Sequence, residues 1–171
     1  MNAHIADQKI HLLVSGLKGR KTMKHIMISI KPEWVEKILR GKKTIEIRKS
    51  IPKDLPCKVY VYCTKDMRYK VVAKELEQVN GKVCAEFTLM HYTKFDIPFP
   101  AYWKDLPDYI KEEIPEKSCL SLNELHHYLD DKTGYAWHIE DLHIYDTPKE
   151  LAEFGLKRPP QSWCYIKGEK Q

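Results

Sequence analysis

The chain has 171 residues, enough for one domain with a substantial buried core. Hydrophobic residues make up 43% and charged residues 31%, as in ordinary soluble globular proteins, and no apolar run approaches the roughly 20 residues that span a bilayer. The apolar stretch 10–17 has one lysine before it and no clear small-residue cleavage site, which argues against a signal peptide. We therefore expect a protein that is not embedded in a membrane.

Cysteine and histidine spacing gives no sign of a metal or a disulfide framework. The number of cysteines is odd and no two of them form a Cys-x-x-Cys pair: Cys57, Cys63, Cys84, Cys119 and Cys164. The histidines of the second half also lack a familiar ligand spacing: His126, His127, His138 and His143. No glycine-rich phosphate loop is present. We expect reduced, mostly buried cysteines, a cytoplasmic location, no metal and no cofactor.

Charge is distributed unevenly along the chain. The whole chain carries +5, whereas residues 1–50 carry +8 and residues 104–153 carry −8. A basic surface concentrates polyanions such as RNA. The same pattern also describes two solvated faces that attract each other, or an acidic stretch that binds a basic protein partner.

The first half of the chain predicts a mobile or extended arm followed by short strands around one helix. Residues 1–23 have no clear periodicity, so the domain is expected to cover 24–167. Alternating apolar residues predict strands at 25–30, 44–48, 59–63 and 81–90, the last one after an Asn80-Gly81 turn. Pro32 is suited to the first position of a helix that Gly41 ends.

The second half predicts an irregular aromatic segment and then more short elements. Residues 91–120 are rich in proline and aromatic residues, and one short helix is expected at 108–113. Capping boxes predict helices at 122–129 and 147–154. Strands are expected at 135–145, with a kink at Glu140-Asp141, and at 162–166. Together these elements indicate an α+β fold, a small mixed β-barrel with short flanking helices.

The strand after Gly41 carries the candidate binding residues. Ile45 and Ile47 are expected on one face, and the other face groups Thr44, Glu46 and Arg48. Two lysines lie nearby in sequence, Lys31 at the helix entrance and Lys43 at the strand entrance. Beside a cleft, these groups would hold a phosphate, a base edge or a polarised carbonyl. The alternative is a surface strand with a weak ion pair, worth about 0–1 kcal/mol.

The stretch 41–48 resembles the signature of ASCH domains, the activating-signal-cointegrator homology group of the PUA-like superfamily. Its pattern Gly-x-Lys-x-x-Glu-x-Arg is matched by Gly41, Lys43, Glu46 and Arg48. The sequence before it, Ser29-Ile30-Lys31-Pro32, is also similar. Further similarity follows in order at 59–64, 81–83, 144–148 and 159–163, so the resemblance covers about 24–167 and leaves out 1–23.

The resemblance implies a β-barrel with a cleft in which Lys43, Glu46 and Arg48 face the ligand. PUA-like relatives bind RNA, and ASCH proteins are generally thought to bind RNA or nucleotides. RNA or a nucleotide is therefore the expected partner, held by Lys31, Lys43, Thr44, Glu46 and Arg48.

A hydrolase is the competing hypothesis. Some small bacterial ASCH proteins that this chain resembles hydrolyse acetylcytidine with a lysine, a threonine nucleophile and a glutamate, and other members cut RNA. The lysine corresponds to Lys43, but the threonine position is occupied by Glu46, and Thr44 lies two positions early. Glu86 is the candidate acidic partner. In such an enzyme Lys43 would stabilise an oxyanion or phosphorane, Glu46 would act as general base and Arg48 would clamp a phosphate.

Overall fold

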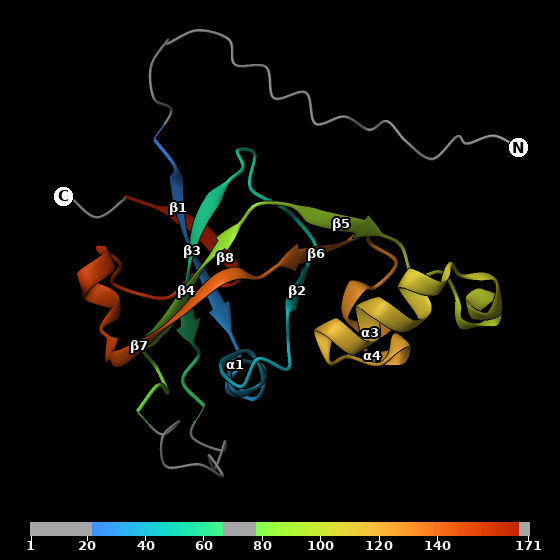
Figure 1. Cartoon of the computed structure of the whole chain (residues 1–171), viewed down its shortest axis with the longest axis horizontal. Helices are drawn as coiled ribbons and strands as arrows, with labels where there is room; N and C mark the ends of the chain where they lie inside the picture. The colour runs from blue at the N-terminus through green and yellow to red at the C-terminus, as the bar shows by residue number, and fades with distance from the viewer. Residues whose placement is uncertain (1–21, 67–77, 168–171) are drawn as a thin grey trace, which may run out of the picture.

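The computed structural model describes residues 22–66 and 78–167, which form two sheets with short helices around them (Figure 1). The five-stranded sheet has the order β7-β4-β3-β1-β8, and the three-stranded sheet has the order β2-β6-β5. The strands are β1 (Lys24–Ile30), β2 (Ile45–Arg48), β3 (Cys57–Cys63), β4 (Val83–Leu89), β5 (Tyr92–Phe95), β6 (Gly134–His138), β7 (Glu140–Lys149) and β8 (Trp163–Ile166). The predicted arm lies almost entirely outside the described residues.

Short helices complete the two layers. α1 (Pro32–Leu39) follows β1 directly, whereas η1 (Pro100–Asp105), η2 (Tyr109–Glu113), α3 (Ile114–Ser118) and α4 (Leu122–Leu129) lie in sequence between β5 and β6. A last turn, η3 (Leu151–Phe154), precedes β8. None of the helices within the described ranges is long and apolar enough to cross a membrane.

β1 is an interior strand of the larger sheet, and both of its faces are buried. Ile26, Ile28 and Ile30 point into the main core, while Met27 belongs to a smaller cluster on the other face. β1 pairs in parallel with β3 and antiparallel with β8. A parallel pair needs a crossover, which the segment containing α1 and β2 supplies.

Local signals set the limits of α1 as predicted. Pro32 occupies the first turn, and Val35 and Ile38 are buried against the main core. Gly41 then takes φ +68°, a left-handed conformation that glycine adopts without steric cost, and the chain turns toward β2.

The smaller sheet has its own core. Ile45 and Ile47 of β2 pack with Leu125 and Leu129 of α4. The predicted capping box of α4 is confirmed, since Ser121 accepts from the Glu124 amide while Glu124 accepts from the Ser121 amide. This core therefore attaches the helical layer to β2.

Two predictions about the second half were wrong in detail, and one strand was missed. The strand expected at 135–145 is two strands in different sheets, which are separated at Ile139, and Asp141 takes φ +49° at the expected kink, just inside β7. The helix expected at 147–154 is instead the end of β7 followed by the η3 turn, and its capping box joins Glu150 to Glu153. Pro148 fits a strand here because β7 is an edge strand, where the missing N–H disturbs no ladder. β5 was not predicted at all.

The α+β class is confirmed, and the sheets form a barrel-like arrangement that stays open. The strand order leaves β7 and β8 at the edges of one sheet and β2 and β5 at the edges of the other. Within the described residues, no pairing joins these edges into a closed barrel.

Gly134 offers a test of how tightly β5, β6 and α4 are packed. A Cβ at this position would lie 2.6 Å from Phe95 Cζ and 2.9 Å from Leu129 Cδ1, and both side chains are buried. We expect Gly134→Ala to lower the free energy of unfolding by about 1–3 kcal/mol, the usual cost of overpacking. Urea denaturation measures this loss, and an unchanged midpoint would show that the two side chains yield freely.

Candidate functional site

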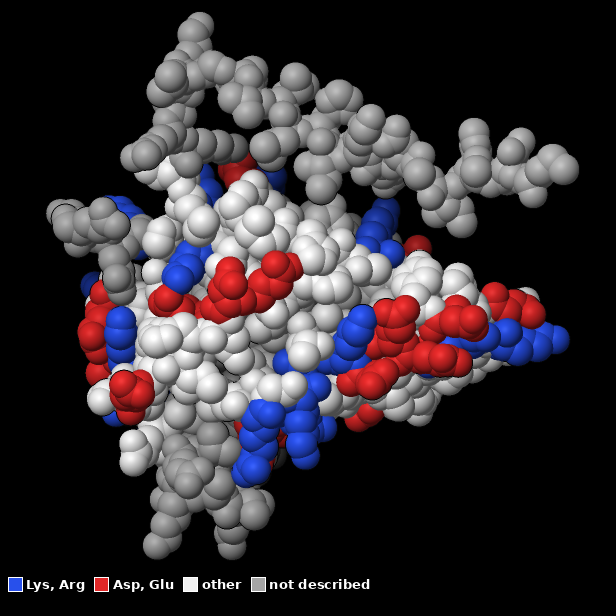
Figure 2. Space-filling model, viewed as in Figure 1, with Lys and Arg blue, Asp and Glu red and all other residues white. Residues whose placement is uncertain are grey.

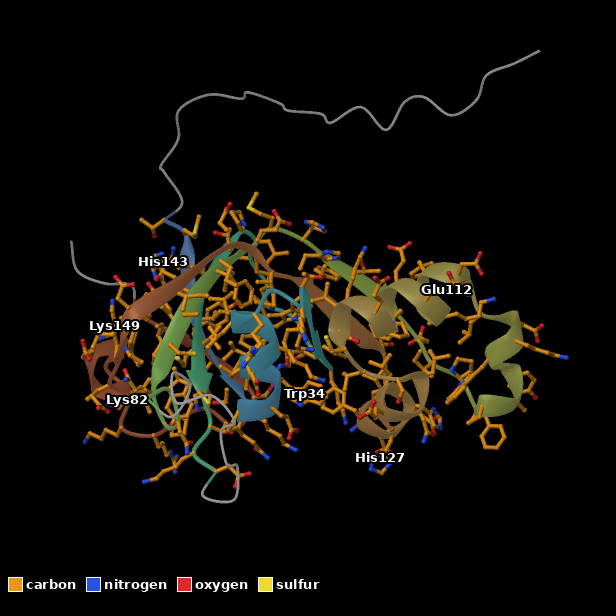
Figure 3. All side chains as sticks on the ribbon, turned by 60° about the horizontal axis from the view of Figure 1, so that its bottom comes forward. Trp34, Lys82, Glu112, His127, His143 and Lys149 are labelled. Carbon is orange, nitrogen blue, oxygen red and sulfur yellow. The ribbon has the colours of Figure 1, made fainter. Side chains whose placement is uncertain are left out.

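A cleft of about 560 Å³ opens between α1 and α4. Its lining residues come from five parts of the chain: 29–34, 43–48, 64, 120–128 and 159–161. Figure 3 shows Trp34 on α1 and His127 on α4 on the same side of the molecule, and both residues line this cleft. Its volume lies within the range of small-molecule sites, roughly 300–1,000 Å³.

The floor of the cleft is a row of three buried charges. Lys43, Glu46 and Arg48 are 2%, 7% and 9% exposed. Lys43 Nζ lies 3.3 Å from Glu46 Oε2, and Arg48 Nη2 lies 3.1 Å from Glu46 Oε1. We call these three side chains the ion row. With two cations and one carboxylate, it carries a net charge of +1.

The local backbone explains how Lys43 reaches this row. The turn at Gly41 lets the Lys43 amide donate to the Lys37 carbonyl. Lys43 therefore belongs to the tight turn that precedes β2, and its side chain extends from this turn rather than from the strand. Its Nζ then donates to the Ser118 carbonyl at the end of α3, at 2.7 Å. Strand alternation in β2 places Glu46 and Arg48 opposite the apolar face of Ile45.

Arg48 connects the floor to the other sheet. Its Nη2 donates to the Ser29 carbonyl on β1 at 2.7 Å, and its Nη1 donates to Ser162 Oγ at 3.3 Å. Among the described residues, its buried Nε has no hydrogen-bond partner. Ser29 Oγ donates to the Pro160 carbonyl at 2.7 Å, which holds the wall formed by 159–161.

The walls are aromatic and proline side chains beside cations. Lys37 Nζ and Lys43 Nζ lie 4.6 Å and 5.4 Å from the centroid of the Trp34 ring. Across the cleft, Lys49 Nζ lies 5.2 Å from the ring centroid of Tyr128. The pKa of Tyr128 is raised, mainly by partial burial. The positive charge of Arg48 acts to lower this pKa, and the negative charge of Glu46 acts to raise it. Tyr128 is therefore within electrostatic reach of the floor.

Four of the five predicted binding residues line the cleft. They are Lys31, Lys43, Glu46 and Arg48. Thr44 is not a lining residue, because β2 begins only at Ile45 and the alternation does not extend back to Thr44. The Thr44 side chain is exposed, and its carbonyl accepts from the Ile139 amide.

The sequence did not identify the walls. Trp34 was assigned only to the apolar stripe of α1, although it also lines the cleft. Tyr128 and the segment 159–161 come from distant parts of the chain, and only the fold brings them to β2. The one signal in the sequence that could have indicated an aromatic wall was the position of Trp34, a few residues before the motif.

Glu86 does not belong to this site. It lies on β4, where Lys58 forms an ion pair with it and Tyr145 OH donates to it at 2.6 Å. Burial acts to raise the pKa of Glu86, but hydrogen bonds from Lys58 and Tyr145 outweigh it and lower the pKa overall. The expectation that Glu86 is the acidic partner of Lys43 is therefore wrong.

Thiol and metal chemistry find little support in the described residues. Burial raises the pKa of Cys63 to about 11 and that of Cys84 to about 12, so both are neutral thiols at neutral pH. Within residues 22–66 and 78–167, no group of three His, Cys, Asp or Glu side chains is placed to hold a metal ion.

Comparison with known proteins identifies the fold. No family model and no curated protein matches the sequence. The structure is similar to the crystal structure of ASCH from Zymomonas mobilis, with a TM-score of 0.59 and 22% identity over 85% of this chain and 90% of that one. A Tyr-to-Phe mutant of that protein gives a TM-score of 0.60 with 20% identity, over 84% and 91% of the two chains. A Ser-to-Ala mutant gives 0.58 with 21% identity, over 84% and 89%.

The charge balance of the ion row predicts an unusual rescue. Glu46→Gln leaves two buried cations without a counter-charge, so we expect it to cost about 3–5 kcal/mol of the free energy of unfolding. Adding Lys43→Met to that variant removes one of the cations and should restore part of the loss. Urea denaturation of both single variants and the double variant measures the coupling. If the double variant is the least stable of the three, charge repulsion does not control this site.

Glu86 predicts a specific dependence of stability on pH. Because its folded-state pKa lies below the ordinary value of 4.5, its contribution is present above that pH and is lost as pH falls through the folded-state pKa. Glu86→Gln should therefore lower stability at pH 7 and flatten the decline of stability below about pH 4.5. Thermal melting between pH 3 and pH 7 tests this, and parallel curves for variant and wild type would contradict it.

Proposed function

Because this chain has the ASCH fold, we propose that it binds RNA or a nucleotide in the cleft between α1 and α4. The observation that carries the proposal is the composition of this cleft, a cationic buried floor between aromatic walls. Arginine and lysine recognise phosphates, and aromatic rings stack on bases. The volume of about 560 Å³ is suited to one nucleotide unit rather than a longer segment.

The surface beside the cleft supports binding of a longer strand. Lys37, Arg40 and Lys42 belong to the second half of α1 and the turn that follows it. Figure 2 shows basic side chains gathered in this region and acidic ones over the neighbouring helical segment. A strand leaving the cleft would therefore be attracted toward Lys37, Arg40 and Lys42 at the far end of α1 and repelled from the helices that follow β5.

A hydrolase remains the second candidate because the floor brings together groups used in acid–base chemistry. Lys43 and Glu46 are in contact and buried, and both line the cleft. Hydrolysis of acetylcytidine or of RNA would use this pair, with Arg48 on a developing negative charge. The hydroxyl of Thr64 also lines the cleft, whereas Thr44 does not.

Trp34 gives the sharpest test of binding. We expect Trp34→Leu to weaken binding of a short single-stranded RNA about tenfold or more, because stacking on an aromatic ring contributes roughly 1–3 kcal/mol per base. Trp103→Leu is the matched control, since Trp103 is also half-buried but packs against the core beside α4, outside the cleft. Fluorescence anisotropy at two salt concentrations measures both variants. Equal losses in the two variants, or no binding by the wild type, would contradict the proposal.

Product analysis separates the two candidates. Wild type is incubated with acetylcytidine and with the same RNA, and Lys43→Met serves as the comparison because it leaves Glu46 paired with Arg48. A pure binding protein gives no product with either substrate. Product formed by wild type and lost in Lys43→Met would establish a hydrolase.

A further inference from the structure

We propose that the floor of the cleft is a site for a terminal phosphate, so that the ligand class is a nucleoside monophosphate or an RNA with a phosphorylated end. This inference rests on the proposed function, because it specifies which part of the nucleotide enters the cleft first. A base edge or a phosphate could each contact the floor. Three features favour the phosphate: the net charge of the ion row, the unpaired donor of Arg48 and the start of α1 beside the floor.

The charge of the floor calls for an anion. The ion row has a net charge of +1 and its three side chains are at least nine-tenths buried. Buried charge without compensation is unfavourable. Neutral bases would leave this excess unchanged, whereas a phosphate would balance it.

The unpaired donor is a nitrogen of the Arg48 guanidinium. The two terminal nitrogens of Arg48 already donate to Ser29, Glu46 and Ser162. Its Nε is buried and has no partner in the described part of the chain, although Arg48 lines the cleft. Leaving such a donor unpaired is unfavourable, so an acceptor oxygen that reaches it on binding is favoured.

The start of α1 adds a second source of positive potential. Lys31 lies at the N-cap of α1 with an extended backbone and no capping hydrogen bond from its side chain. The first N–H groups of a helix lack intrahelical partners, and the helix dipole favours an anion at this end. Lys31 and Thr64 also follow directly on the carboxyl ends of the parallel strands β1 and β3, and both line the cleft. Ligands of open α/β sheets bind at such strand ends.

The rim favours a phosphate at the end of a chain over one inside it. Glu33 and Glu124 line the cleft as exposed carboxylates, so further phosphates near them would be repelled. Glu124 is held by the amide and hydroxyl of Ser121. The RNA chain continues on both sides of an internal phosphodiester, so it would have to leave the buried floor in two directions. From a terminal phosphate it continues in only one direction. A terminal phosphate also carries about −1.5 to −2 at pH 7, which opposes the positive charge of the ion row and Lys31, whereas Glu33 and Glu124 lie at the exposed rim, where solvent screens them.

Oligouridylates of one length with different ends provide the test. Versions with a 5′-phosphate, a 3′-phosphate and only hydroxyl ends are compared by anisotropy competition, together with uridine and its 5′- and 3′-monophosphates. We expect at least one phosphorylated end to bind tenfold or more tightly than the hydroxyl ends, with the same preference among the mononucleosides. Inorganic phosphate should compete at constant ionic strength.

Two variants connect this preference to the proposed residues. Lys31→Ala should reduce the advantage of the phosphorylated end several-fold, while Lys94→Ala, an exposed charge on β5 outside the cleft, should leave it unchanged. Arg48→Lys keeps the charge, removes the Nε donor and should reduce the advantage further; Lys31→Ala answers the question if that variant does not fold.

The outcomes separate the two proposals. Equal affinity for all ends, with binding still lost in Trp34→Leu, would overturn the terminal-phosphate site and leave the nucleotide-binding cleft standing. If none of the RNAs or nucleotides binds, the proposed function itself fails, and the terminal-phosphate site falls with it.

Discussion

The position of Glu46 between two buried cations is the constraint on which the rest of the structure depends. β2 has only four residues, all of them buried, and two of these carry charge. Burial is tolerable only because Lys43 and Arg48 both contact the Glu46 carboxylate. The cations in turn bond to the end of α3 and to β1, so one carboxylate fixes the helical layer and both sheets relative to one another.

If the cleft binds the proposed ligand, the same side chains serve both stability and binding. Most donors of the ion row are occupied by carbonyls and by Glu46, so few of them would be available to the proposed ligand. A site assembled in this way is held rigidly before a ligand arrives, which reduces the entropy lost on binding. The cost is that substitutions on the floor disturb the fold as well as the affinity, whereas Trp34 and Lys31 at the wall and rim are more accessible to separate tests.

Local signals in the sequence were sufficient for several of the elements and for the floor, but not for β5 or for the end of β7. Pro32, Gly41 and the Ser121 capping box act within a few residues, and the structure contains what they predict. The choice between strand and helix at Pro148 depended on whether β7 is an edge strand, which only the whole sheet decides. The exclusion of Thr44 likewise depended on where β2 begins.

The walls were beyond prediction because they depend on contacts between distant segments. Tyr128 and the segment 159–161 reach the cleft only when α4 and β8 are in place. The resemblance of the motif to ASCH domains located the floor, and no comparable pattern marks the walls. Glu86 shows the limit of arguing from a polar strand face, since it faces Lys58 and Tyr145 rather than the cleft.

The hydrogen bond from Ser29 to Pro160 spans 131 positions and has a consequence for the order of events during synthesis. β1 emerges from the ribosome early, but its partner β8 is the last of the described strands. Until β8 pairs, Ser29 has no Pro160 carbonyl to bond and Arg48 has no Ser162. Contacts of such long range form late in folding. During synthesis the chain therefore carries its floor charges before the wall formed by 159–161 is in place, so the complete cleft exists only in the finished domain.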